Sequence, residues 1–117
     1  MRADVFDRKC PSRQLLDRIG DTWSVLVVVS LADGSLRYSE LGARIDGVSP
    51  KMLTQALRGL ERDGLLTRTV HAVVPPRVDY ALTDLGRSLL GLVRALEDWA
   101  ETHIGDVVEA RGAYDGR

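Results

Sequence analysis

The sequence predicts a mainly α-helical fold with one small β hairpin. Short apolar segments recur at helical spacing, glycine and proline residues mark their ends, and two strand-like stretches follow one another in the second half of the chain. The 117 residues, 44% hydrophobic and 28% charged, suit one globular domain spanning residues 1–117. No internal repeat or Gly/Ser-rich linker divides the sequence.

The N-terminal third of the chain is expected to form two helices. The first covers residues 13–19, and the second covers residues 23–32 after a cap at Asp21 or Thr22. The run Val25–Val29 favours a strand by propensity, but the segment is about twelve residues long, which is ordinary for a helix and long for a strand. We therefore expect a buried helix.

The middle of the chain predicts two helices joined by a tight turn. Ser39 is expected to cap a short helix, Gly47 lies in the turn, and a longer helix begins at Ser49-Pro50 and runs to about Arg62. Serine at the N-cap with proline at the first helical position is a strong start signal. Residues 39–62 therefore indicate a helix-turn-helix.

Residues 65–82 predict an antiparallel hairpin directly after the helix-turn-helix. Its strands cover residues 65–71 and 77–82, and the second strand alternates apolar and polar side chains. The joining segment 72–76 contains two prolines and is too stiff for a two-residue turn, so we expect a projecting wing. A brief further strand is expected at residues 36–38.

Thr83 is expected to cap a final helix that runs over about residues 83–103. Its apolar side chains follow alternating steps of four and three residues, a period that suits a coiled-coil-like contact. Leu85 and Leu89 could instead close the core of the monomer. The residues expected to cross a homodimer interface are Leu92, Leu96, Trp99 and His103. With N- and C-terminal helices for dimerisation, the predicted fold is a winged helix-turn-helix.

The helix that begins at Ser49 has two chemically different faces. Leucines and an alanine gather on one side, and the other side carries hydrogen-bond donors, with Glu61 at its margin. The major groove of DNA admits one helix and is read near that helix's N-terminus. There, Lys51 can bond guanine or a phosphate, Gln55 can contact adenine, and Thr54 can offer a hydroxyl or pack its methyl on thymine.

Contacts to the DNA backbone are expected from cations and from helix starts. Arginine side chains can bind phosphates. A helix N-terminus with its serine hydroxyl can also bind a phosphate, and this needs no additional basic residue. Residues 49–62 hold three basic residues and one acidic residue, whereas residues 81–117 hold four basic and seven acidic ones. The carboxyl-terminal part should therefore face away from DNA. The expected backbone contacts are Ser39, Ser49, Arg58, Arg62, Arg68 and Arg77.

The strings SPKMLTQALRGLERDGLLTR and VPPRVDYALTDLG resemble the HxlR-type winged helix-turn-helix transcriptional regulators of bacteria, within the MarR-like superfamily. The resemblance extends from Cys10 to near His103. It implies a homodimer on a near-palindromic operator, with the helix from Ser49 in the major groove and the hairpin loop near the minor groove. The sequence departs from the family at Val73, where charged residues are common, and at Asp21-Thr22.

Cys10 stands beside Arg8, Lys9 and Arg13, just before the first helix. Nearby positive charge and the helix dipole are expected to lower the pKa of its thiol. The resemblance implies a sensor of oxidants or electrophiles at this position. The effector class that we expect is an oxidant or a small molecule, which the sequence does not identify. The alternative is a small, half-buried residue without a signalling role.

Other function classes find little support in the sequence. It has neither a glycine-rich phosphate loop nor a nucleophile elbow, so we expect no enzyme and no cofactor. Cys10, His71 and His103 do not have the spacing of a zinc site. With no signal peptide and no membrane span in the pattern, a cytoplasmic location is expected. The remaining alternative is a winged-helix module that binds protein and not DNA.

Overall fold

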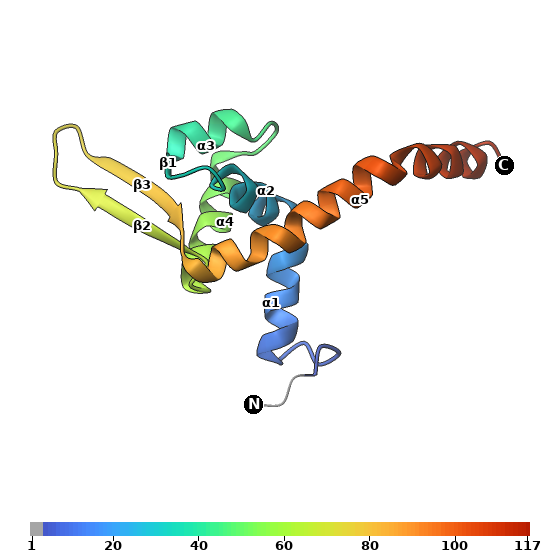
Figure 1. Ribbon diagram of the computed structural model, residues 1–117, viewed down its shortest axis with the longest axis horizontal. Coiled ribbons are helices and arrows are strands. Elements are labelled where there is room, and N and C mark those ends of the chain that lie inside the picture. The colour runs from blue at the N-terminus through green and yellow to red at the C-terminus, as the bar shows by residue number, and fades with distance from the viewer. Residues whose placement is uncertain (1–3) are drawn as a thin grey trace.

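The computed structural model describes residues 4–117 and confirms a mainly helical fold with a small sheet (Figure 1). The elements are α1 (Pro11–Gly20), α2 (Thr22–Ser30), β1 (Leu36–Arg37), α3 (Tyr38–Arg44), α4 (Pro50–Arg62), β2 (Leu66–His71), β3 (Arg77–Leu82) and α5 (Asp84–Asp115). Helices α2, α3 and α4 and the start of α5 form one body, from which the hairpin and the rest of α5 project on opposite sides, while α1 extends in a third direction.

The valine-rich second segment is helical, as expected from its length. Asp21 is its N-cap, and the Asp21 carboxylate accepts hydrogen bonds from the backbone N–H of Ser24 at 3.1 Å and from the Ser24 hydroxyl at 2.7 Å. Val27 and Val28 are completely buried in the core. The gain from burying this helix on several sides outweighs the weak helix propensity of valine.

The core lies where α2 crosses α3 and α4, and the sheet and the start of α5 close it. The N-terminal helix α1 lies at the edge of this body, with Leu15 and Leu16 44% and 52% exposed. An ion pair of 3.1 Å between Arg18 Nε and Asp63 Oδ2 ties α1 to the end of α4. The apolar side chains buried most completely are Val27, Val28, Leu31, Leu41, Leu53, Leu60 and Val93.

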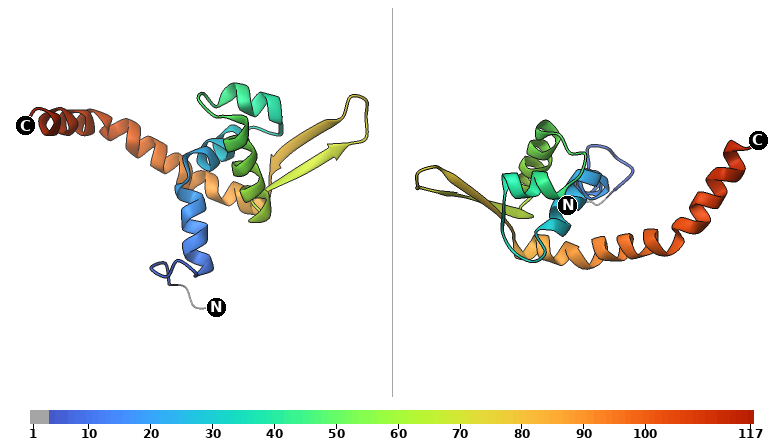
Figure 2. Two further views of the ribbon diagram at one scale, coloured as in Figure 1. Left: turned by 180° about the vertical axis from the view of Figure 1, so that it is seen from behind. Right: turned by 90° about the horizontal axis from the view of Figure 1, so that it is seen from above.

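The hairpin carries a third strand. The sheet order is β1-β3-β2, and all neighbouring strands are antiparallel. Leu36 pairs with Tyr80 on one side of β3, and Leu66 pairs with Leu82 on the other. The brief expected strand is therefore part of the sheet, and the 72–76 connection projects from the body as the predicted wing (Figure 2).

Helix α3 begins before Ser39, so the expectation that Ser39 caps this helix is wrong. Arg37 is the N-cap, and its backbone N–H donates to the Glu40 carboxylate at 2.9 Å. Arg37 also pairs with Asp79 in the sheet, which fixes the point where the strand ends. Strand pairing and the Glu40 side chain thus set the helix start, and Ser39 lies inside the first turn.

Helix α5 is longer than expected and ends at Asp115 instead of near His103. Its predicted N-cap is confirmed, because the Thr83 hydroxyl accepts from the Gly86 N–H at 3.1 Å and donates to the Gly64 carbonyl at 2.6 Å. Beyond His103 the chain has no proline, and an isolated glycine costs a helix only about 1 kcal/mol. Within residues 4–117, no helix is long and apolar enough to cross a membrane.

Candidate nucleic-acid interface

Helix α4 presents one buried and one exposed face. Ser49 is its N-cap, and the Ser49 hydroxyl accepts from the Met52 backbone N–H at 3.1 Å, as the sequence predicts. The buried face packs on α2 and the sheet and consists of Leu53, Ala56, Leu57, Gly59 and Leu60. The exposed side chains on α4 include Lys51, Gln55, Arg58 and Arg62.

Thr54 is half-buried on the same helix and is held by a residue that sequence reasoning missed. Its Oγ1 lies 3.2 Å from the Tyr38 hydroxyl oxygen, and the Tyr38 hydroxyl donates to the Pro50 carbonyl at 3.0 Å. These contacts join the start of α3 to the first turn of α4. No local sequence pattern predicts a contact between residues that are 16 positions apart.

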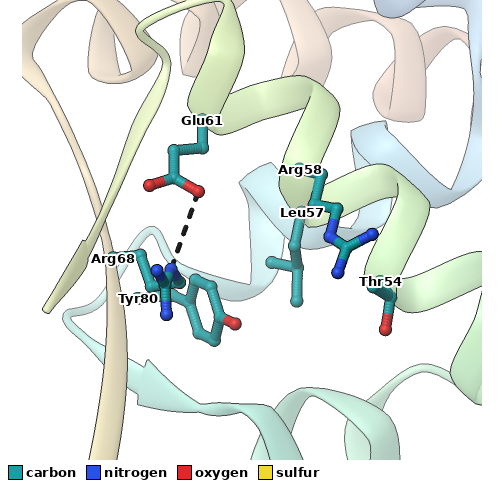
Figure 3. A pocket seen from close by; sticks show the side chains of 6 residues that line it. All are labelled: Thr54, Leu57, Arg58, Glu61, Arg68 and Tyr80. Carbon is teal, nitrogen blue, oxygen red and sulfur yellow. Dashed lines mark ion pairs between the residues drawn. The ribbon is translucent and has the colours of Figure 1, made fainter. Parts of the chain in front are cut away.

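A surface cavity of about 280 Å³ lies between α4 and the hairpin (Figure 3). Arg58 and Arg68 line it from the two elements, and Arg68 Nε lies 3.8 Å from Glu61 Oε1. Tyr80 forms part of its wall, and burial raises the pKa of the Tyr80 hydroxyl. With two guanidinium groups against one carboxylate, the cavity is net positive and suits an anion.

Arg77 is anchored by an acidic neighbour at the base of the wing. Its Nε and Nη2 donate to the Asp79 carboxylate at 3.1 and 3.0 Å, and His71 Nε2 lies 2.9 Å from the same carboxylate. The hydrogen bonds from Arg77 lower the pKa of Asp79, and the same contacts raise the pKa of Arg77. Residues two apart on a strand share a face, so strand periodicity was a signal for this pair.

The structure brings together only part of the predicted DNA-contact set. Arg58 and Arg68 share the cavity of Figure 3, and Ser39 and Arg77 line a separate surface hollow between α3 and β3. Arg62 ends α4, roughly 18 Å from its N-terminus at 1.5 Å per residue. The exposed donors of α4 and the cavity that lies along this helix from Thr54 to Glu61 are therefore the compact part of the site.

Helix α5 leaves most of its apolar side chains exposed. We call Leu92, Leu96 and Trp99 the α5 stripe, and they are 52% to 60% exposed; Ile104 and Val108, further along the helix, are 49% and 55% exposed. The Trp99 ring stacks on the His103 ring with centroids 4.6 Å apart. Leu89 packs against the core of the monomer, which is the alternative role expected for it. Leu85 is 58% exposed and does not close the core.

Cys10 is buried at the start of α1, with only 7% of its surface exposed. The Asp4 backbone N–H donates to its sulfur at 3.3 Å, and this contact, followed by the N–H groups of Ser12 and Arg13, lowers the pKa of the thiol against the opposing effect of burial. The expected lowering of the Cys10 pKa is confirmed. Hydrogen bonds from backbone N–H groups cause it, whereas the neighbouring basic side chains do not. The Arg13 guanidinium instead donates to the Val5 carbonyl at 3.2 Å.

The described part of the chain holds no cluster of side chains typical of a metal site. Residues 4–117 contain no group of three or more His, Cys, Asp and Glu side chains placed to hold a metal ion. The predicted DNA-contact side chains that line surface hollows do so at two places: the cavity beside α4 and the base of the wing.

Comparison with known proteins agrees with this arrangement. Residues 18–107 match the family model described as HxlR-like helix-turn-helix. The HTH-type transcriptional regulator YtfH of Escherichia coli K12, itself uncharacterised, is 44% identical over 109 residues, which are 93% of this chain and 86% of YtfH.

Solved structures show the same fold. The putative transcriptional regulator YtfH from Salmonella typhimurium has a TM-score of 0.87 and 43% identity, over 95% of this chain and 99% of its own. The redox regulator HypR in its reduced form has a TM-score of 0.76 and 37% identity, over 86% of this chain and 98% of its own. The chain therefore belongs to the HxlR-like helix-turn-helix family.

Proposed function

We propose that this chain is a DNA-binding transcriptional regulator that places the N-terminal turns of α4 in the major groove. The carrying observation is the exposed donor face of a helix whose opposite face is fully packed, so that the donors are rigidly held at the surface. In this position Lys51, Thr54 and Gln55 reach base edges. The relatives named transcriptional regulators support the same assignment.

Backbone phosphates are bound around the groove-facing turns. Arg58 and Arg68 seat one phosphate at the positive cavity, and the N-terminus of α4 with the Ser49 hydroxyl receives another. Arg77 still has three of its five N–H donors available after binding Asp79. Ser39 follows Tyr38, whose hydroxyl contacts the first turn of α4, so Ser39 is kept as a backbone contact. Arg62 ends α4, far from its N-terminus, and makes a weaker contact.

The functional unit is a homodimer formed through the α5 stripe and α1. Exposed leucines, isoleucine, valine and tryptophan on one long helix favour burial against a second copy. A two-fold axis then places two α4 helices on half-sites of a near-palindromic operator, about 34 Å apart. The acidic α5 helices point away from the wing, as Figure 2 shows, and so away from the DNA.

The test is a titration of selected duplex DNA at fixed salt with Lys51→Ala plus Gln55→Ala. We expect specific binding to weaken by at least tenfold, because each base contact is worth about 1–3 kcal/mol. Glu109→Ala, an exposed change near the end of α5, serves as the control and should bind like the parent. Unchanged affinity of the double variant would refute this placement of α4.

Salt dependence separates DNA binding from the alternative of a protein-binding winged helix. Contacts of several cations to phosphates make affinity fall steeply as salt rises. A largely apolar protein contact has no such dependence. A flat salt profile would therefore favour the protein-binding alternative.

Regulation by oxidants or electrophiles at Cys10 is a second proposal. It rests on a thiol of lowered pKa at the N-terminus of α1, together with the likeness to HypR, a redox regulator solved in oxidised and reduced forms. The sulfur is covered in the reduced fold, so the segment before α1 has to open before it reacts.

Treatment with diamide tests this proposal. We expect the parent protein to form a crosslinked dimer and to change its DNA affinity, and Cys10→Ser to do neither. Because the sequence holds a single cysteine, any disulfide between copies must involve this residue. If the parent and Cys10→Ser respond alike, Cys10 is only a packing residue.

A further inference from the structure

Tyr38 and Thr54 form a hydrogen-bonded link between the two helices of the helix-turn-helix. The Tyr38 hydroxyl oxygen lies 3.0 Å from the Pro50 carbonyl oxygen and 3.2 Å from Thr54 Oγ1. Pro50 is the first residue of α4, and Thr54 lies one turn later on the same helix. Both side chains are half-buried, so the link is partly shielded from water.

The number of available protons fixes the direction of both hydrogen bonds. A carbonyl oxygen only accepts, so the single hydroxyl proton of Tyr38 goes to Pro50. In the second contact the Tyr38 oxygen must then accept, and the Thr54 hydroxyl must donate. The only proton that Thr54 could offer to DNA is thus used inside the protein.

We propose that Tyr38 is a specificity-determining positioning residue, which leaves Thr54 able to accept but not to donate a hydrogen bond in the major groove. This inference rests on the proposed placement of α4. In the major groove adenine N6 and cytosine N4 are donors, whereas guanine O6 and N7 and thymine O4 are acceptors. Thr54 therefore favours adenine or cytosine at the position that it faces.

The position of Thr54 supports this role. Thr54 is partly exposed in the first half of α4, one turn before Arg58, and Figure 3 shows its hydroxyl at the opposite side of the cavity from Arg68, at the edge of the proposed phosphate position. The threonine oxygen has two lone pairs, and donation to Tyr38 uses neither of them. An acceptor thus remains within reach of a partner outside the protein.

A purely structural role for Tyr38 predicts a different outcome. If the hydroxyl only steadied the first turn of α4, its removal would weaken binding to every sequence by a similar factor. If it sets the proton of Thr54, its removal frees a donor and changes base preference at one position per half-site. The pattern across bases, and not the mean affinity, separates these roles.

The experiment selects duplexes from a random-sequence pool with the parent protein and with Tyr38→Phe, and then titrates duplexes that differ at single positions. We expect one position per half-site to lose its preference for adenine or cytosine by up to about tenfold in Tyr38→Phe, the worth of one net hydrogen bond. Other positions keep their preferences. Tyr114→Phe, which removes a hydroxyl near the end of α5, is the matched control and should keep the parent profile.

Thr54→Val supplies a second, independent measurement, because valine keeps the shape but loses the hydroxyl. It should abolish the preference at the same position, and adding Tyr38→Phe should then change nothing further. An unchanged profile in Tyr38→Phe, a uniform weakening, or a shift that persists in the Thr54→Val background would each overturn the inference. If the parent itself enriches no duplex, the proposed function fails and the inference fails with it.

Discussion

Helices α4 and α5 both carry a leucine-rich side, but the monomer covers only one of them. On α4, Leu53, Leu57 and Leu60 are 1 to 2% exposed, and Met52, at 37%, is the apolar side chain of this helix that reaches solvent beside the polar face. On α5, Leu92 and Leu96 are both 52% exposed. The two helices have similar patterns in sequence and opposite states of burial in the structure.

This difference shows that an apolar stripe identifies a contact but does not identify the partner. For α4 the partners are α2 and the sheet, which the chain brings together by folding. For α5 only the first turns meet the body, and the remainder extends beyond it (Figure 1). An exposed stripe of this length on a folded chain is typical of an association surface.

The largest expected effect is on the α4 side of this comparison. Leu60→Ala should lower the free energy of unfolding by about 2–5 kcal/mol, because it leaves a cavity in a closely packed core. The same substitution at Leu96, measured at a protein concentration low enough to keep the chain monomeric, should cost less than about 0.5 kcal/mol. Urea unfolding followed by circular dichroism measures both, and equal costs under these conditions would break the comparison.

The start and end of α4 could be predicted because the signals are local. Ser49 and Pro50 set its beginning, its leucines mark the buried face, and Gly64, with a φ of 75°, follows its end. Gly64 adopts the left-handed conformation that other residues avoid, so the stop is encoded in one residue. Local chemistry and tertiary packing agree here.

Other features depended on residues far apart in the chain. The start of α3 follows from the pairing of Arg37 with Asp79, which no window around Ser39 contains. The link from Tyr38 to Thr54 likewise joins two helices. The pairing of Arg77 with Asp79, in contrast, could have been predicted from the sequence, because the two residues share one face of a strand.

The end of α5 was missed for a different reason. The regular stripe stops at His103, and Gly105 and Gly112 resemble stop signals. In the structure both glycines lie within the helix, with neither at its end. The apolar side chains of Ile104 and Val108 continue along this segment, so the exposed surface is longer than the pattern indicated.

The smaller expected effect concerns this surface. Trp99→Ala and Leu96→Ala should shift the monomer–dimer equilibrium towards monomer by about ten- to one-hundredfold each, because truncating a buried apolar side chain at an interface costs about 1–3 kcal/mol. Arg94→Ala lies on the exposed back of the same turns and is the matched control, with little effect expected. Analytical ultracentrifugation over a range of micromolar concentrations gives the equilibrium constants.

The same variants connect association to DNA binding. A dimer bound to two half-sites gains from the linkage of its two α4 helices, so loss of association should weaken operator binding even though α4 is unchanged. The deficit should shrink as protein concentration rises and the dimer is restored. If Trp99→Ala dissociates at the same concentration as the parent, the α5 stripe is not the dimer interface. The exposure of the α5 leucines would then need another explanation.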